Sequence, residues 1–224
     1  MTAAARDKHA SAHVDTWLDQ ADAALTAVEG LYRDAMEGVR TLVSKDGKIS
    51  AGLFEREQHA AHGLSWFATY VQAIREMIAY ARRLEDAGAL GEIETLLTRI
   101  GLSEYVAQVF GGIPMSQGEM VRPSDFGLTG EQVAKRRSAA GENVIASGNT
   151  TQNRARLADL SDHSSASATV GDPGLDETLI AIREEVRKYA ESEVTPHAHE
   201  WHLRNEYIPL DVIKGLADLG VFGL

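Results

Sequence analysis

Two short groups of histidines are the first candidates for a chemical site in this sequence. His59 and His62 follow Glu55 at spacings that bring side chains to one face of a helix, where the three could hold a metal ion. The Glu-x-x-His pairs that di-iron helical bundles use are missing from the sequence. We therefore interpret these residues as surface or structural histidines and predict no metal ligand.

A second group lies in PHAHEWH, which places His197, His199, Glu200 and His202 close together. Imidazole and carboxylate groups at such spacing could form a metal or acid–base site. The stretch is expected to cross the end of a helix, so we interpret these residues as solvated polar positions between two packed elements. No catalytic residue is predicted in the chain, and its cofactor-binding residues stay unknown.

The familiar motifs for phosphate binding and acyl transfer do not occur. The sequence has no G-x-G-x-x-G after a strand, no Walker loop and no G-x-S-x-G elbow. The stretch FGGIPMSQG contains glycines suited to a phosphate cradle, but no lysine or strand accompanies them. Gly111 and Gly112 are instead predicted to end a helix.

Composition excludes further classes. The 33 acidic against 22 basic residues give a net charge of −11, which argues against a broad nucleic-acid surface. The absence of cysteine excludes disulfides, cysteine-ligated zinc, iron–sulfur clusters and a thiol nucleophile. The sequence contains no secretory signal and no apolar run of about 18 residues. We expect a cytoplasmic protein that binds neither nucleic acid nor membrane.

The elements that must position any site are predicted to be helices, so the fold class is all-α. The first 113 residues contain no proline, which favours long helices. Apolar residues at three- and four-residue spacing predict one helix from Val14 to Leu42 and a second from Leu53 to Asp86, with SKDGKIS between them. A third helix is predicted over Leu90 to Ile100. Gly101 is expected to interrupt it before a short fourth helical segment. Short connections predict an up-down bundle over residues 1–138.

The sequence then changes character. Thr129 and Gln132 could form a capping box for a short helix. Residues 139–174 are rich in Ser, Thr, Ala and Asn and contain few large apolar groups. Such a segment buries too little surface to offset its ordering entropy, so it is predicted to be a flexible linker with a boundary near residue 172.

Residues 175–224 predict two amphipathic helices. The first is expected to end by Pro196, Pro209 suits the first turn of the second, and Gly220 can cap that helix. A piece this small buries its apolar surface poorly. Because the last residues, Val221 to Leu224, are apolar or glycine, we expect the chain to be the front of a longer protein. The apolar face of the first helix consists of Leu179, Ile182, Val186, Tyr189 and Val194, and that of the second of Val212, Ile213, Leu216 and Leu219.

This last segment resembles the opening of acyl-CoA dehydrogenases. The resemblance covers about 50 residues in a consistent order. His202 stands where that family usually has aspartate, a departure that affects a local cap or ion pair. The residues that carry the resemblance are Tyr189, Glu191, Glu193 and Pro196, then Glu200 and Trp201, then Tyr207, Ile208 and Pro209, and finally ADLGVFGL from Ala217 to Leu224.

The resemblance implies a flavin-dependent enzyme that uses FAD, takes an acyl-CoA substrate and passes electrons to an electron-transferring flavoprotein. It also implies a homo-oligomer, and it places the flavin domain and the catalytic glutamate beyond residue 224. The segment is then the incomplete start of the N-terminal α-domain, and the fragment itself is expected to be inactive. FEREQHAAHGLSWFATYVQAIREM and GLSEYVAQVFGGIPMSQGEMVRP resemble a helical extension that precedes the dehydrogenase start in one member of the family. The run Arg56, Glu57, Gln58 and His59 also resembles the family's helical C-terminal region.

Two alternatives remain. A non-catalytic helical interaction module would contain the same amphipathic helices without any flavin chemistry. A metal–carboxylate helical bundle would rest on His59 and His62 alone.

Overall fold

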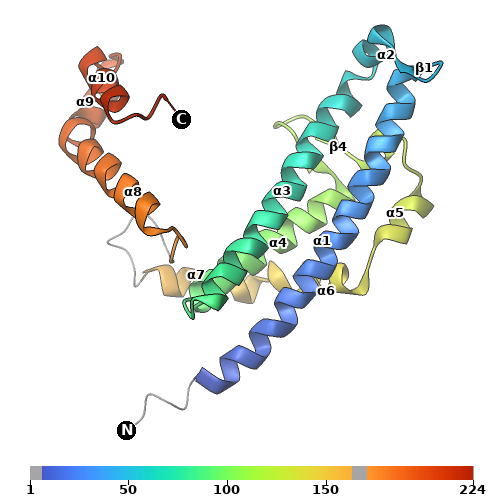
Figure 1. Cartoon of the computed structure of the whole chain (residues 1–224), viewed down its shortest axis with the longest axis horizontal. Coiled ribbons are helices and arrows are strands. Elements are labelled where there is room, and N and C mark those ends of the chain that lie inside the picture. The colour runs from blue at the N-terminus through green and yellow to red at the C-terminus, as the bar shows by residue number, and fades with distance from the viewer. Residues whose placement is uncertain (1–6, 163–170, 224) are drawn as a thin grey trace. The chain divides into compact units, whose positions relative to one another are not determined.

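The structure, a computed structural model, describes residues 7–162 and 171–223 of the chain (Figure 1). Side chains are described for residues 17–161 and 171–223. The chain divides into two compact units, Met1–Asp172 and Pro173–Leu224. This division falls beside the boundary that the sequence predicts near residue 172.

The first unit is built on three long helices. Helix α1 (Asp7–Val43) runs beside α3 (Gln58–Asp86), and α3 packs on α4 (Glu92–Gly111) (Figure 1). Helix α1 has 37 residues and is therefore about 55 Å long. The described residues are mainly helical, with two small hairpins, so the predicted all-α class is confirmed.

The connection between α1 and α3 is more structured than a simple break. Strands β1 (Ser44–Lys45) and β2 (Lys48–Ile49) pair as an antiparallel hairpin. Asp46 and Gly47 form its turn with φ of 53° and 76°, the left-handed conformation that a two-residue Asp-Gly turn adopts. The short helix α2 (Ala51–Arg56) follows and stops at Glu57, so the predicted second helix is two helices.

Helix α4 runs unbroken through Gly101, so the predicted interruption is wrong. A Cβ atom at this position would lie 2.9 Å from the sulfur of Met77 on α3. The glycine thus allows close approach of two helices, and packing offsets its low helix propensity.

The predicted linker is also wrong over residues 139–162. Helix α5 (Gly130–Arg136) is followed by α6 (Ala139–Gly148) and α7 (Thr151–Asp162), and α6 packs on both α1 and α4. A Cβ on Gly148 would lie 2.3 Å from the carbonyl oxygen of Arg99, so small residues let α6 approach α4. The Ser103 hydroxyl also donates to the carbonyl of Ile145 at 2.8 Å. Residues 163–170 of the predicted linker lie outside the described residues.

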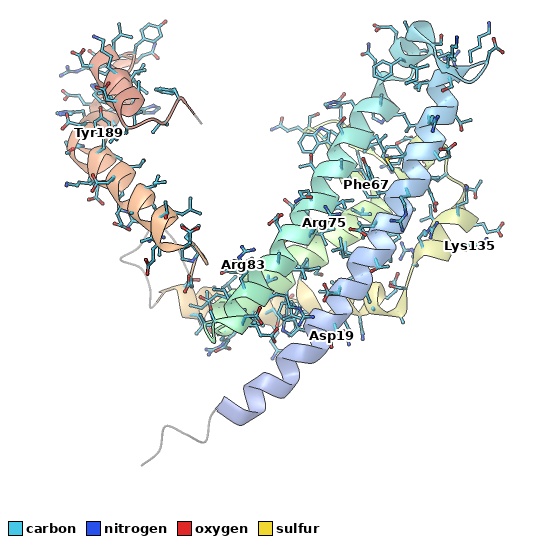
Figure 2. All side chains as sticks on the ribbon, in the orientation of Figure 1. Asp19, Phe67, Arg75, Arg83, Lys135 and Tyr189 are labelled. Atoms are coloured by element: carbon cyan, nitrogen blue, oxygen red, sulfur yellow. The ribbon has the colours of Figure 1, made fainter. Side chains whose placement is uncertain are left out.

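The core lies between α1, α3 and α4 and is closed by the loop after α4. That loop contains strands β3 (Ile113–Pro114) and β4 (Met120–Val121) and the 3-10 turn Pro123–Phe126. Phe67, which is labelled on α3 in Figure 2, is fully buried. Its ring centroid lies 5.3 Å from that of Tyr32 and 5.8 Å from that of Phe126. The other large side chains that are almost fully buried are Leu18, Val28, Leu31, Ile74, Leu102, Val106, Val109, Ile113 and Val121.

The second unit is a bent helix followed by a shorter one. Helix α8 (Glu177–Tyr189), the π-helical turn Ala190–Val194 and helix α9 (Thr195–Arg204) are continuous. The predicted helix end at Pro196 is therefore wrong. Pro196 lies in the first turn of α9, where its missing N–H costs little because the preceding π turn has already changed the hydrogen-bond register.

Helix α10 (Leu210–Asp218) begins directly after Pro209. Gly220 has a φ of 81°. The N–H of Gly220 donates to the carbonyl of Ala217, and the N–H of Val221 donates to the carbonyl of Leu216. This is a Schellman end, which confirms the predicted glycine cap.

Candidate functional site

The first histidine group is divided between two elements. Glu55 lies on α2, whereas His59 and His62 lie on α3 beyond the break at Glu57. Nε2 of His62 accepts a hydrogen bond from Nε1 of Trp66 at 3.0 Å, so that nitrogen cannot also ligate a metal. Nε2 of His59 lies 3.6 Å from a carboxylate oxygen of Asp125, which also accepts the N–H of Arg122.

The second histidine group lies within α9 instead of at a helix end. The His197 ring packs on Trp201 with centroids 5.6 Å apart, and Glu200 pairs with Arg204 one turn later. His199 and His202 are exposed. Across the residues that the structure describes, no group of three or more His, Asp and Glu side chains is placed to hold a metal ion.

The glycines of FGGIPMSQG serve the hairpin and not a phosphate. Gly112 ends α4 as predicted, and its N–H bonds to the carbonyl of Gln108. A Cβ on Gly112 would lie 2.6 Å from the sulfur of Met120, so the space beside it is already filled by the opposite strand.

The second unit contains the most unusual surface. No side chain described between Pro173 and Gly223 is buried. Tyr207 is 98% exposed, and Phe222 is 65% exposed. Isolated apolar residues on a surface are ordinary, but a small helical unit with no buried side chain is not. The other exposed large apolar residues of this unit are Leu179, Ile180, Ile182, Leu203, Ile208, Leu210, Ile213, Leu219 and Val221.

A side-chain hydrogen bond joins two helices of the second unit. The Tyr189 hydroxyl donates to the carbonyl of Val212 at 2.9 Å and so joins the end of α8 to α10 (Figure 2). A Cβ on Gly215 would lie 2.1 Å from the Tyr189 oxygen, so only glycine lets the ring reach α10. Partial loss of solvent around the hydroxyl raises the pKa of Tyr189, and the nearby Glu193 and Asp218 raise it further.

The sequence identified Tyr189 and the apolar face but not the role of Gly215. Gly215 lies inside a helix, where glycine weakens the helix unless something approaches it closely. The presence of a glycine inside a predicted helix was therefore the sequence signal for this contact. The described side chains of this face are apolar, and such a surface suits packing against protein.

Among the described residues no helix is both long and apolar enough to cross a membrane.

Comparison with known proteins gives two matches. Residues 176–224 match the family described as acyl-CoA dehydrogenase, N-terminal domain. The chain is also 46% identical over 211 residues to (2S)-methylsuccinyl-CoA dehydrogenase from Cereibacter sphaeroides, and the match covers 92% of the chain and 37% of that protein. The chain thus spans a little over a third of the length of this relative. Because 92% of the chain is aligned, the similarity includes most of the first unit as well as the second.

Proposed function

We propose that the chain is the N-terminal part of a flavin-dependent acyl-CoA dehydrogenase acting on (2S)-methylsuccinyl-CoA, because residues 176–224 match the N-terminal domain of acyl-CoA dehydrogenases. The observation that carries the proposal is the 46% identity across 92% of the chain. A match confined to the second unit would indicate only the family. The inclusion of the helical extension favours the substrate of the relative.

The proposed overall reaction removes a proton from the α-carbon and a hydride from the β-carbon of the acyl thioester, which yields mesaconyl-CoA. FAD would supply the chemistry of hydride acceptance. Electron-transferring flavoprotein is the proposed electron acceptor, and the cytoplasm is the proposed location of the enzyme.

The described residues do not fit a flavin site. No described side chain of the second unit is buried, and in the first unit the space beside Gly112 is filled by Met120. A dinucleotide needs donors that converge in a concave site, and neither unit shows such a group. We therefore assign flavin binding and the catalytic base to regions of such an enzyme that correspond to the unmatched part of the relative.

The second unit has a structural role in this proposal. Its apolar side chains, which include Leu179, Ile182 and Ile213, provide the surface on which further helices of the same α-domain would pack. Burial of each large apolar side chain contributes about 1.5–3 kcal/mol, so this face can stabilise a larger domain considerably.

The first unit is proposed to serve as a docking or oligomer-contact element and not as a second active site. Its centre is filled by apolar side chains such as Phe67 and Ile74 and leaves no room for a substrate. Its polar groups form ion pairs between helices, as Arg82 does with Asp19 and Asp22. These features suit a rigid structural element.

The test compares the product of the complete open reading frame with residues 1–224 alone. The complete product should be yellow, and (2S)-methylsuccinyl-CoA should bleach its flavin faster than the (2R) isomer or butyryl-CoA does. Residues 1–224 should be colourless and inactive. A reading frame that stops after Leu224, or a complete product without flavin, would favour the helical interaction module. Bleaching by butyryl-CoA alone would retain the family and overturn the substrate.

A further inference from the structure

A buried carboxylate bridges two backbone segments at one end of the first unit. Glu94 is only 8% exposed and lies in the first turn of α4. Its Oε2 accepts the N–H of Gly91 at 3.1 Å, and its Oε1 accepts the N–H of Asp172 at 2.7 Å. The first contact caps the helix. The second reaches the last residue of the first unit, 78 positions later in the chain.

A second side chain binds the same residue from the neighbouring helix. The hydroxyl of Tyr80 on α3 donates to the carbonyl of Asp172 at 2.5 Å. Both backbone groups of Asp172 are therefore held, one by α4 and one by α3. Burial raises the pKa of Tyr80, and Glu94 and Asp172 raise it further while Arg83 lowers it. The hydroxyl accordingly remains a donor at neutral pH.

The backbone before Asp172 is shaped for this contact. Gly171 has φ of 85°, a conformation that disfavours residues with a side chain. A Cβ at this position would lie 3.0 Å from Oε1 of Glu94 and 3.3 Å from Cγ2 of Ile93. Glycine therefore permits the close approach of the chain to α4.

We propose that Glu94 and Tyr80 form a clamp that fixes Asp172 to the α3–α4 end of the first unit, so that residues 173–224 depart from a fixed point and not from a free tether. This inference goes beyond the proposed function and does not depend on it. It also changes the role of the predicted linker, because the end of that segment is anchored to the extension.

The chemistry of Glu94 suits this role better than that of an amide. A carboxylate offers two acceptor oxygens, and each accepts one N–H here. Glutamine offers only one acceptor, and at this position of a helix it serves the cap well. Substitution by glutamine should therefore keep the bond to Gly91 and lose the bond to Asp172.

Hydrogen exchange of the backbone amides of residues 1–224 tests the clamp. In Glu94→Gln, and in Glu94→Ala, which removes both acceptors, the Asp172 amide should exchange about tenfold faster or more, as expected for loss of a hydrogen bond to a charged group. Tyr80→Phe should accelerate exchange of the Asp172 amide less, because the Glu94 carboxylate that accepts this N–H remains. The matched control is Glu92→Gln, because Glu92 lies on the same turn and binds Arg156 instead.

The control should leave the Asp172 amide unchanged, and amides in the middle of α3 should exchange at the wild-type rate in every variant. The clamp is overturned if the Asp172 amide of the wild type exchanges like that of an unstructured peptide. It is equally overturned if both Glu94 variants leave that amide unaffected. These exchange rates do not depend on enzymatic activity. Failure of the clamp and failure of the proposed function are therefore separate results.

Discussion

Asp34 on α1 and Arg136 on α5 form a two-point ion pair although they are 102 positions apart in the sequence. Nε and Nη2 of Arg136 lie 2.6 Å and 2.7 Å from the two carboxylate oxygens of Asp34. Gly30 makes room for the pair, because a Cβ there would lie 3.1 Å from the guanidinium. This geometry joins a short peripheral helix to the longest of the described helices.

The ion pair should make the free energy of unfolding depend on pH. The hydrogen bond from Arg136 lowers the pKa of Asp34 below the ordinary range of an aspartate, although burial opposes the shift. A lowered folded-state pKa contributes stability that is present above the unfolded value and lost as pH falls through the folded value. Arg136→Gln should therefore lower the urea midpoint at neutral pH, and the difference from wild type should shrink as pH falls below the ordinary pKa of an aspartate and then through the lower pKa of Asp34 in the folded protein.

Arg154→Gln is the control for this pH series, since Arg154 binds the amide of Asn149, which does not titrate. Its difference from wild type should stay constant over the same range. A gap between Arg136→Gln and wild type that does not change with pH would contradict the ion-pair account.

Phe67→Ala should be among the most damaging single changes. Phe67 is fully buried and contacts two aromatic rings, so its removal leaves a cavity that helices cannot easily close. The expected loss of unfolding free energy is about 3–5 kcal/mol. Phe54→Ala, at a side chain 47% exposed, is the matched control and should cost less than about 1 kcal/mol. Equal losses in urea denaturation would show that the core is not where the structure places it.

Gly38→Ala should displace the 3-10 turn Pro123–Phe126. A Cβ at position 38 would lie 2.0 Å from the carbonyl oxygen of Phe126, which is backbone and cannot rotate away. We expect a destabilisation of about 1–3 kcal/mol from this overpacking. Gly52→Ala introduces the same methyl group on α2 with nothing within 4 Å, and it should be neutral or slightly stabilising. Thermal unfolding of both variants distinguishes the contact from the general effect of replacing a helical glycine.

Residues 1–224 should self-associate through the second unit. Its uncovered apolar residues, Phe222 and Ile182 among them, provide a surface that water solvates poorly. The double variant Phe222→Ser, Ile182→Gln should shift sedimentation velocity profiles toward monomer. Ile49→Gln removes an equally exposed apolar side chain from the hairpin of the first unit and should leave association unchanged. A wild-type chain that sediments as a single monomer would contradict the prediction.

The periodicity of apolar residues located the long helices because each helix buries one continuous stripe, and that stripe is a local property of the sequence. Sequence also predicts three local features, because each depends on a few neighbouring residues. They are the break at Asp46–Gly47, the cap at Thr129 and the Schellman end at Gly220. The order of motifs in residues 175–224 also indicated the family without any structure.

Tertiary structure decided what no local pattern contains. Gly101 does not interrupt α4, and residues 139–162 are helices instead of a linker, because contacts with Met77 and Arg99 from other helices offset weak local propensity. The clamp on Asp172 depends on Tyr80 and Glu94, which the sequence separates from it by 92 and 78 positions. Local sequence determines which elements form, whereas close packing between distant segments determines where they end and what they hold.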